Sequence, residues 1–286
     1  MGVAITTTLK VVYTMYSENI DNFAMIGSHK AHTLRHRPLA FLLGAMMAGA
    51  YIGFGDILMF SVGAHLSAAF AHLIMGAVFA SALTIVVFAG SDLFTGTAMY
   101  MPLAWLRRQT NGLNVVSVWV FCWIGNLIGA VILALLLHMA GGGVLLTDGA
   151  DIFFKAVQAK MDAPGEALFA RGLLCNWLVC LAIWMAGRTT SDSAKLGLIF
   201  WPVFAFVASG FEHSVANMFV FALALLGEHP ATITLAGAVH NEIWVTLGNI
   251  AGGAIFMALG YWLQGNSAGH ASHTSLGGAV TNPRPS

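Results

Sequence analysis

The sequence predicts an all-α membrane protein of six transmembrane helices, built as an inverted 3+3 repeat in which the second and fifth helices are broken. Three observations support this fold class: the composition, two polar interruptions inside long apolar segments, and a repeated Gly-Asn motif. Hydrophobic residues make up 58% of the 286 residues and charged residues only 8%, and the mean hydropathy is +0.80. Because soluble domains carry about 25% charged residues, this chain is expected to cross a membrane several times.

The transmembrane helices are predicted from stretches of about 20 apolar residues, the length that crosses a bilayer as a helix. Two of the six stretches are too long for one straight crossing, so each is expected to contain two half-helices joined by a loop. The stretches lie at residues 39–62, 71–106, 114–139, 167–187, 196–226 and 242–263, and the second and fifth are the broken ones.

Two segments are expected to flank the membrane domain, which covers residues 38–263. In residues 1–37, apolar side chains such as Leu9, Tyr13, Tyr16 and Ile20 recur at helical spacing, which predicts an amphipathic helix that ends before Pro38. Such a helix either docks on the membrane surface or caps a pore. Residues 264–286 are small, polar and rich in Gly and Ser, which predicts a disordered tail.

The distribution of Lys and Arg predicts that both termini lie in the cytoplasm, because cytoplasmic loops carry the excess of these residues. Of the twelve, only Lys155, Lys160 and Arg171 fall on the side opposite to the termini. Residues 1–37 lack the short apolar core and cleavage site of a signal peptide, so the first span is expected to be an uncleaved anchor.

Net charge and cysteine content argue against two other classes of protein. The formal net charge is 0, which gives no electrostatic basis for binding nucleic acid. The three cysteines, Cys122, Cys175 and Cys180, fall in apolar stretches, and an odd number argues against a disulfide framework. They are interpreted as small packing residues.

Each broken stretch contains an acid and a glycine at a depth where lipid tolerates neither. The interruptions are residues 90–96, with the sequence GSDLFTG, and residues 209–217, with the sequence SGFEHSVAN. Polar, irregular backbone at membrane depth persists only where it is buried in protein or lines a wet cavity. Gly90 and Gly210 are 120 residues apart, and two such breaks at matching positions predict a solute pathway.

The third and sixth stretches share a Gly-Asn-x-x-Gly motif, at residues 125–129 and 248–252, which are 123 residues apart. A repeat of three spans places the two halves in opposite orientations, with the site near mid-membrane. The glycines are expected to allow close helix packing. Asn126 and Asn249 carry amides that need partners inside a span, so each is expected to hold the loop of its own half.

A second half-helix is expected to begin after each break, near Thr97 and near Ser214. The free N–H groups and positive dipole ends of two such helices would favour a small anion without any Lys or Arg in the breaks. Asp92 and Glu212 are therefore interpreted as helix caps rather than as ligands for a cation.

His213 is the one group in the breaks that changes charge near neutral pH. We expect it to donate a hydrogen bond or a proton to a passing anion, with Thr95 as its hydroxyl partner from the opposite half. The alternative is a neutral, structural histidine that is satisfied by neighbouring amides such as those of Asn176 or Asn249.

The two breaks resemble the signature loops of the formate/nitrite transporter family. Residues 175–185 and 244–249 match the family as well, and the resemblance runs from about Pro38 to Trp262. Residues 48–51 and 234–237 look most similar to the nitrite channels of the family and less similar to its formate and hydrosulfide channels.

The resemblance implies an aquaporin-like protomer with its own pore, a homopentamer in the bacterial inner membrane, contact with lipid, and no cofactor or metal. It also implies roles for particular residues. The pore histidine falls on His213, the loop threonine on Thr95, the supporting asparagines on Asn176 and Asn249, the apolar constrictions on Phe79 and Leu83 on one side and Phe206 on the other, and the anion-attracting vestibule lysine on Lys160; Glu212 is included in the substrate pathway.

One residue departs from the family pattern. Asp56, in the first span, stands where an apolar residue is expected, and a carboxylate facing the pore would oppose the access of anions. Asp56 is therefore interpreted as lying near the outer interface, where it faces water or a neighbouring subunit.

The predicted function is transport of nitrite, or of a similar small monovalent anion, without enzymatic activity. Two routes are open. In the first route, the helix dipoles stabilise the anion throughout its passage. In the second route, His213 protonates the anion at the constriction. Formate and hydrosulfide are the alternative substrates.

Rival classes make different predictions. A sensor or scaffold predicts no flux. A water or glycerol channel would carry paired Asn-Pro-Ala motifs, and neither break contains proline. A membrane-embedded metalloenzyme could use His213, His240 and Glu242, but we identify no His-x-x-x-His pair or Cys-x-x-Cys run that gives ligand spacing on one helix.

Overall fold

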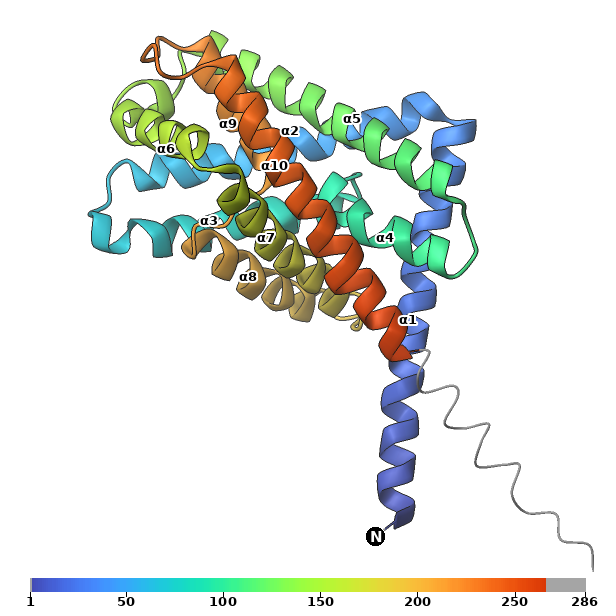
Figure 1. Ribbon diagram of the computed structural model, residues 1–286. Helices are drawn as coiled ribbons and strands as arrows, with labels where there is room; N and C mark the ends of the chain where they lie inside the picture. The colour runs from blue at the N-terminus through green and yellow to red at the C-terminus, as the bar shows by residue number, and fades with distance from the viewer. Residues whose placement is uncertain (1, 266–286) are drawn as a thin grey trace, which may run out of the picture.

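The computed structural model describes residues 2–265, and every regular element in this range is a helix (Figure 1). In chain order the elements are α1 (Gly2–His36), α2 (Pro38–Gly63), α3 (Ala68–Ala89), α4 (Phe94–Leu106), α5 (Gly112–Met139), η1 (Val144–Leu146), α6 (Ala150–Asp162), α7 (Gly165–Ala186), α8 (Asp192–Ala208), α9 (Ser214–Leu226), α10 (Leu235–Ala251) and η2 (Gly252–Leu259). The last of these is a π-helix that continues α10. The predicted disordered tail lies outside the described residues, apart from its first two positions.

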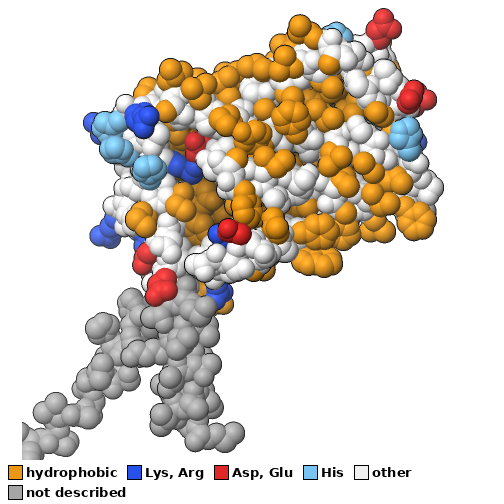
Figure 2. Space-filling view, turned by 180° about the vertical axis from the view of Figure 1, so that it is seen from behind, with side chains coloured by type: hydrophobic (Ala, Val, Ile, Leu, Met, Phe, Trp, Pro, Cys, Tyr) orange, Lys and Arg blue, Asp and Glu red, His pale blue; other side chains and the backbone are white. Residues whose placement is uncertain are grey.

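Several helices are long and apolar enough to cross a membrane. In residues 2–265 these are the segments Pro38–Gly63, Phe70–Ala89, Gly112–Met139, Gly165–Ala186 and Leu235–Gly265. Figure 2 shows hydrophobic side chains over most of the face it presents, with charged and histidine side chains gathered at two opposite ends. This distribution is the one that a multi-pass membrane protein requires, because charge is costly within the hydrocarbon layer.

The two polar interruptions of the sequence are breaks between helices. α3 is followed by a short loop and then α4, and α8 is followed by a similar loop and then α9. Gly90 and Gly210 lie at the start of these loops with φ values of 71° and 70°. Glycine adopts this left-handed conformation without the penalty that a Cβ brings. The same residue type therefore ends the first helix of each pair in the same way.

The starting points of the second helices differ slightly from the prediction. α9 begins at Ser214, as expected, whereas α4 begins at Phe94 rather than near Thr97. The side chain of Asn126 accepts a hydrogen bond from the Phe94 N–H at 2.8 Å. This bond satisfies an N–H group that would otherwise have no partner at the helix start, and so supports the earlier first turn.

Helix packing repeats between the two halves of the chain. α2 packs on α3 and α5, and α7 packs in the same way on α8 and α10. α9 contacts α5 and α2, as α4 contacts α10 and α7, while α3 and α8 contact each other. Segments that are far apart in the sequence therefore lie together around the two breaks (Figure 1).

The glycines of the repeated motif lie where helix backbones meet. A Cβ added to Gly129 would overlap the carbonyl group of Met46 in α2, and one added to Gly252 would overlap the carbonyl group of Leu173 in α7. Only glycine permits this approach, so the predicted packing role is confirmed.

Helix α6 is absent from the sequence prediction. Its buried side chains are Phe153, Val157 and Met161, which recur every four residues on one face, and Lys155 and Lys160 lie between them. This amphipathic pattern is the signal by which it could have been found. The helix matters because it brings Lys160 into contact with Glu212 in the second break.

Helix α10 begins seven residues before the predicted boundary at residue 242. The Thr234 side chain accepts a hydrogen bond from the Gly237 N–H at 3.1 Å and caps the helix there. The prediction placed the boundary at Glu242 because charge usually marks the edge of a span. Glu242 instead lies within the helix, and both of its carboxylate oxygens are shielded from solvent.

Helix α1 agrees with the prediction in its extent, since it ends at His36, before Pro38. Ile20, Phe23 and Ala24 are buried in the core, and the helix packs against α4. This part of α1 therefore belongs to the bundle rather than only resting beside it.

Candidate functional site

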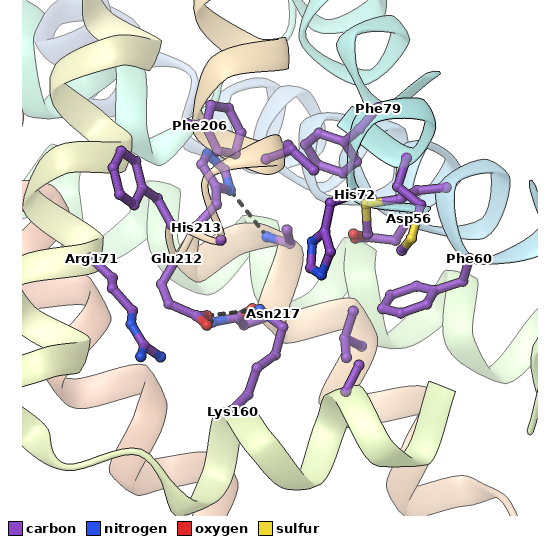
Figure 3. Close-up of a pocket in the computed structure, with 18 of the residues that line it drawn as sticks. Asp56, Phe60, His72, Phe79, Lys160, Arg171, Phe206, Glu212, His213 and Asn217 are labelled. Atoms are coloured by element: carbon purple, nitrogen blue, oxygen red, sulfur yellow. Dashed lines mark hydrogen bonds and ion pairs between the residues drawn. The ribbon is translucent and has the colours of Figure 1, made fainter. Parts of the chain in front are cut away.

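Two cavities of about 290 Å³ each lie toward opposite ends of α3 and α7. The first, here called the Lys160 cavity, is lined by the first part of α3 and the start of α7 (Figure 3). The second, the Lys30 cavity, is lined by the last part of α3, the end of α7 and helix α1. Each cavity also touches one of the two breaks, so each break forms part of the wall of one cavity.

Apolar side chains separate the two cavities. The rings of Phe79 in α3 and Phe206 in α8 meet edge to face, with centroids 6.0 Å apart, and both line the Lys160 cavity. Leu83, one turn along α3, lines the Lys30 cavity instead. Leu93 in the first break also lines the Lys30 cavity and is buried, although the sequence analysis did not single it out.

His213 lies in the second break and is fixed at both ring nitrogens. Its Nδ1 accepts a hydrogen bond from the Ala216 N–H at 3.1 Å, so His213 caps helix α9. Its Nε2 lies 3.0 Å from Oγ1 of Thr95, in the first break. Because Nδ1 accepts a hydrogen bond, this pattern assigns the proton of a neutral ring to Nε2, which then donates to Thr95.

This arrangement answers the question of what satisfies His213. The alternative of a purely structural histidine predicted that side-chain amides such as those of Asn176 or Asn249 are its partners. The partners are instead the backbone N–H of Ala216 and the hydroxyl of Thr95 from the opposite half. The ring also stacks near Phe206, with centroids 6.1 Å apart. Both His213 and Thr95 are buried.

Asn126 and Asn249 hold their loops in the same manner, as the sequence analysis predicted. Each side-chain oxygen accepts from the first N–H of the following half-helix, at 2.8 Å from Phe94 and 3.0 Å from Ser214. Each amide nitrogen donates to two backbone carbonyls, of Ala45 and Asp92 for Asn126 and of Gly172 and Glu212 for Asn249. One buried amide in each half thus satisfies three backbone groups that lipid cannot.

Asn176 joins the two halves. Its amide nitrogen donates to the carbonyl of Thr95 at 3.1 Å and to the carbonyl of Asn249 at 2.6 Å. The first bond holds the first break and the second holds helix α10 beside it.

The three cysteines of the apolar stretches are free and buried, as the packing interpretation expects.

The acids of the breaks do not cap helices, which corrects the sequence interpretation. The N-cap positions belong to Leu93 and His213, one residue after each acid. Asp92 instead forms an ion pair with Lys30 of α1, and Glu212 pairs with Lys160 of α6 at 2.8 Å. The cap prediction failed because both lysines come from helices that lie far away in the sequence.

A polar network surrounds the pair of Lys160 and Glu212. Lys160 also donates to the side-chain oxygen of Asn217 at 2.9 Å, and the Asn217 amide donates to Glu212 at 2.7 Å and to Asn241 at 2.8 Å. Asn241 in turn donates to the backbone carbonyl of Lys160. Lys160 therefore lines its cavity with much of its charge already compensated.

Asp56 is buried inside the molecule rather than facing bulk water or a neighbouring subunit, and this corrects the sequence interpretation. Its side chain is 1% exposed and lines the Lys160 cavity. The interpretation assumed that an acid in a span must face water or another subunit. The cavity provides a third location that a helical pattern alone does not reveal.

The residues proposed for a metalloenzyme do not form a metal site. Over the described range, no group of three or more His, Cys, Asp or Glu side chains is arranged to hold a metal ion. One His-x-x-x-His pair was overlooked in the sequence: His32 and His36, on the exposed end of α1, stack with ring centroids 4.1 Å apart.

Comparison with known proteins gives one consistent family. A model of the formate/nitrite transporter family matches residues 17–263. The nitrite transporter NirC of Salmonella typhimurium is 46% identical over 248 residues, which cover 87% of this chain and 91% of that protein.

Solved structures agree with the sequence comparison. One, described as an FNT family ion channel, is 46% identical and matches 87% of this chain and 99% of its own with a TM-score of 0.84. Another, a pentameric formate channel with formate bound, is 28% identical and matches 79% of this chain and 96% of its own with a TM-score of 0.67. The chain is a multi-pass membrane protein that belongs to the formate/nitrite transporter family.

Proposed function

We propose that this protein is a channel of the bacterial inner membrane that carries nitrite across the bilayer. The observation that carries the proposal is the contact of His213 with Thr95 between the two cavities. This hydrogen bond joins a residue of each break beside the ring of Phe206. The choice of nitrite rests on the 46% identity to a nitrite transporter.

The proposed architecture has six crossings in an aquaporin-like inverted repeat. α3 with α4 and α8 with α9 form the two broken crossings, and the repeated packing of α2–α5 and α7–α10 supports the inverted relation. Both termini lie in the cytoplasm, so the Lys30 cavity faces inward and the Lys160 cavity outward. A homopentamer with one pore per subunit is supported by the similarity to a pentameric formate channel.

In the proposed path, nitrite reaches the Lys160 cavity, loses water between Phe79 and Phe206, and meets His213 and Thr95. Neutral His213 offers its Nε2–H to the anion as a hydrogen-bond donor. The Thr95 hydroxyl beside it offers a second donor. The N-terminal ends of α4 and α9 add favourable potential without a full positive charge. The anion then leaves past Leu83 into the Lys30 cavity.

The hydrogen bonds of His213 favour passage as the anion. A second proton would have to reside on Nδ1, which accepts from the Ala216 N–H and caps α9. Protonation would therefore break the cap and leave an N–H group without a partner, a cost of about 1–3 kcal/mol. Proton-coupled transport through His213 is the competing route, and it requires α9 to change at its first turn.

Purified protein in liposomes tests the function directly. Nitrite uptake well above that of protein-free liposomes is expected, with formate taken up more slowly under the same gradient. A formate rate that exceeds the nitrite rate would assign the chain to the alternative supported by its formate-channel neighbour, and hydrosulfide is tested in the same way. Absence of any flux would favour a sensor or scaffold and contradict the proposal.

A further inference from the structure

Asp56 is a buried acid that the transport path described above does not use. It lies in α2, its side chain is 1% exposed, and its Oδ2 has no hydrogen-bond partner among residues 2–265. Figure 3 shows Asp56 among the side chains that line the Lys160 cavity, on the same side as His72 and Phe79. An acid in this environment normally has a compensating partner.

The other acid of the cavity does have such partners. Glu212 is compensated by Lys160 and Asn217, as described above. The acid of the first break, Asp92, also has a partner, because it is paired with Lys30, which lines the Lys30 cavity. Of the two carboxyl groups that line the Lys160 cavity, Asp56 is thus the one with a buried oxygen, Oδ2, that has no hydrogen-bond partner in the described structure.

The charges that face Asp56 across the cavity come from four elements. They are His72 on α3, Lys160 on α6, Arg171 on α7, and Glu212 with His213 in the second break. Helices α5 and α9 also pack on α2, but neither carries Asp, Glu, Lys or Arg, and His138, in the last turn of α5, is exposed on the surface. When Asp56 is ionised, the negative charges of Asp56 and Glu212 balance the positive charges of Lys160 and Arg171. When Asp56 is neutral, the cavity carries an excess of positive charge.

Asp56 also lies beside the apolar constriction. The preceding residue, Gly55, has the Phe79 ring 3.4 Å from the position that a Cβ would occupy. Phe79 in turn contacts Phe206, and Asp56 lines the same cavity as both rings, so Asp56 lies on the approach to the point where an anion must lose its water. A charge here acts on the anion at the stage where solvent screens it least.

We propose that Asp56 controls the access of anions to the constriction from the Lys160 cavity. The neutral acid admits the anion and offers it an O–H donor, whereas the carboxylate repels it. No proton needs to cross the membrane, because the proton of Asp56 exchanges with the solution on its own side. This inference rests on the proposed function, and it adds a residue that makes nitrite flux depend on external protons.

The test compares Asp56→Asn with the native protein in liposomes over a series of pH values, with the same pH on both sides. Asn has nearly the shape of Asp and is always neutral. Native flux is expected to fall as the pH rises, and the Asp56→Asn flux is expected to exceed it at alkaline pH on the order of tenfold, as for other charges in narrow clefts. Protonation of nitrite itself affects both proteins equally.

Two controls make the comparison specific. Asp151→Asn removes an acid from the exposed first turn of α6, outside the cavity, and is expected to keep the native pH profile. Asp56→Ser supplies a smaller neutral side chain if the Asn variant does not assemble, and it is expected to show the same gain at alkaline pH.

An Asp56→Asn flux that follows the native pH profile, at the native or a lower rate, would overturn the inference and leave the channel proposal intact. A native protein that gives no nitrite flux would contradict the proposed function itself and, with it, this inference. The two failures are therefore distinguishable in one series of measurements.

Discussion

At the scale of single residues, the centre of the molecule depends on side chains that each serve two neighbours. His213 caps α9 with one ring nitrogen and contacts Thr95 with the other. Asn176 binds one carbonyl in each half. Such residues could be predicted from the sequence because a polar group inside an apolar stretch requires partners. The identity of those partners could not, since a hydroxyl and a backbone N–H leave no pattern in the chain.

The substitution His213→Asn separates the two roles of this residue. Asn is a good N-cap, so its side chain is expected to keep the bond to the Ala216 N–H and preserve α9. It is too short to replace Nε2 beside Thr95, so the anion loses one donor. Loss of a hydrogen bond to a charged group costs about 1.5–3 kcal/mol, so nitrite flux is expected to fall at least about tenfold.

The measurement is nitrite flux in liposomes with assembly checked by size-exclusion chromatography. A variant that assembles and retains native flux at every pH would show that His213 is structural only.

The pair of Lys160 and Glu212 allows a second prediction at this scale. Lys160→Met leaves the carboxylate of Glu212, 5% exposed, without its cation. Removing one partner of a buried ion pair costs about 3–5 kcal/mol, so a clear loss of thermal stability is expected. The double variant Lys160→Met with Glu212→Gln is expected to recover most of this loss, because the amide no longer carries charge. Equal melting temperatures of the single and double variants would contradict the pairing.

At the scale of elements, helix breaks and helix packing follow from short, local signals. Gly90 and Gly210 end helices in the left-handed region, and the Gly-Asn motifs mark where backbones approach. Helix α6 and the early start of α10 escaped prediction for a different reason. α6 is amphipathic and short, so hydropathy does not reveal it, and the acid Glu242 concealed a helix that continues through it.

Two glycines of α5 provide a matched test of helix packing. Gly129→Ala places a methyl group against the backbone of Met46, so α2 and α5 must separate. Overpacking of this kind costs about 1–3 kcal/mol, and a lower melting temperature and lower yield of assembled protein are expected. Gly112→Ala meets open space in the same helix and is expected to be neutral or slightly stabilising. If both variants melt alike, the glycine contact is not what holds these helices together.

At the scale of the whole molecule, the same arrangement occurs twice, once in each half of the chain. Each half supplies a lysine from a helix that precedes its first span, an acid in its break, and an asparagine that holds the break. The halves differ at the residue that precedes the second helix of each pair. The residue before Phe94 is Leu93, whereas the residue before Ser214 is His213, so one half supplies an apolar wall and the other a hydrogen-bond donor.

The matched breaks and the repeated helix packing could be predicted from the sequence because the motifs that mark them recur at a regular spacing. The lysine–acid pairs and the location of Asp56 could not, because they depend on how helices from distant segments surround the two cavities. Asp56 is the clearest case, since its residue type suggested an outer surface and its position is internal.

The central claim is that nitrite crosses as an anion past a neutral His213. Its most direct test is the reversal potential of the nitrite current through purified protein in a planar bilayer, measured with a nitrite gradient and an imposed pH gradient. The account predicts that the reversal potential follows the nitrite gradient and does not shift with the proton gradient. The pH changes only the size of the nitrite current, because protonation of Asp56 controls the access of the anion. A reversal potential that shifts with the proton gradient would contradict it and show that protons cross with the anion.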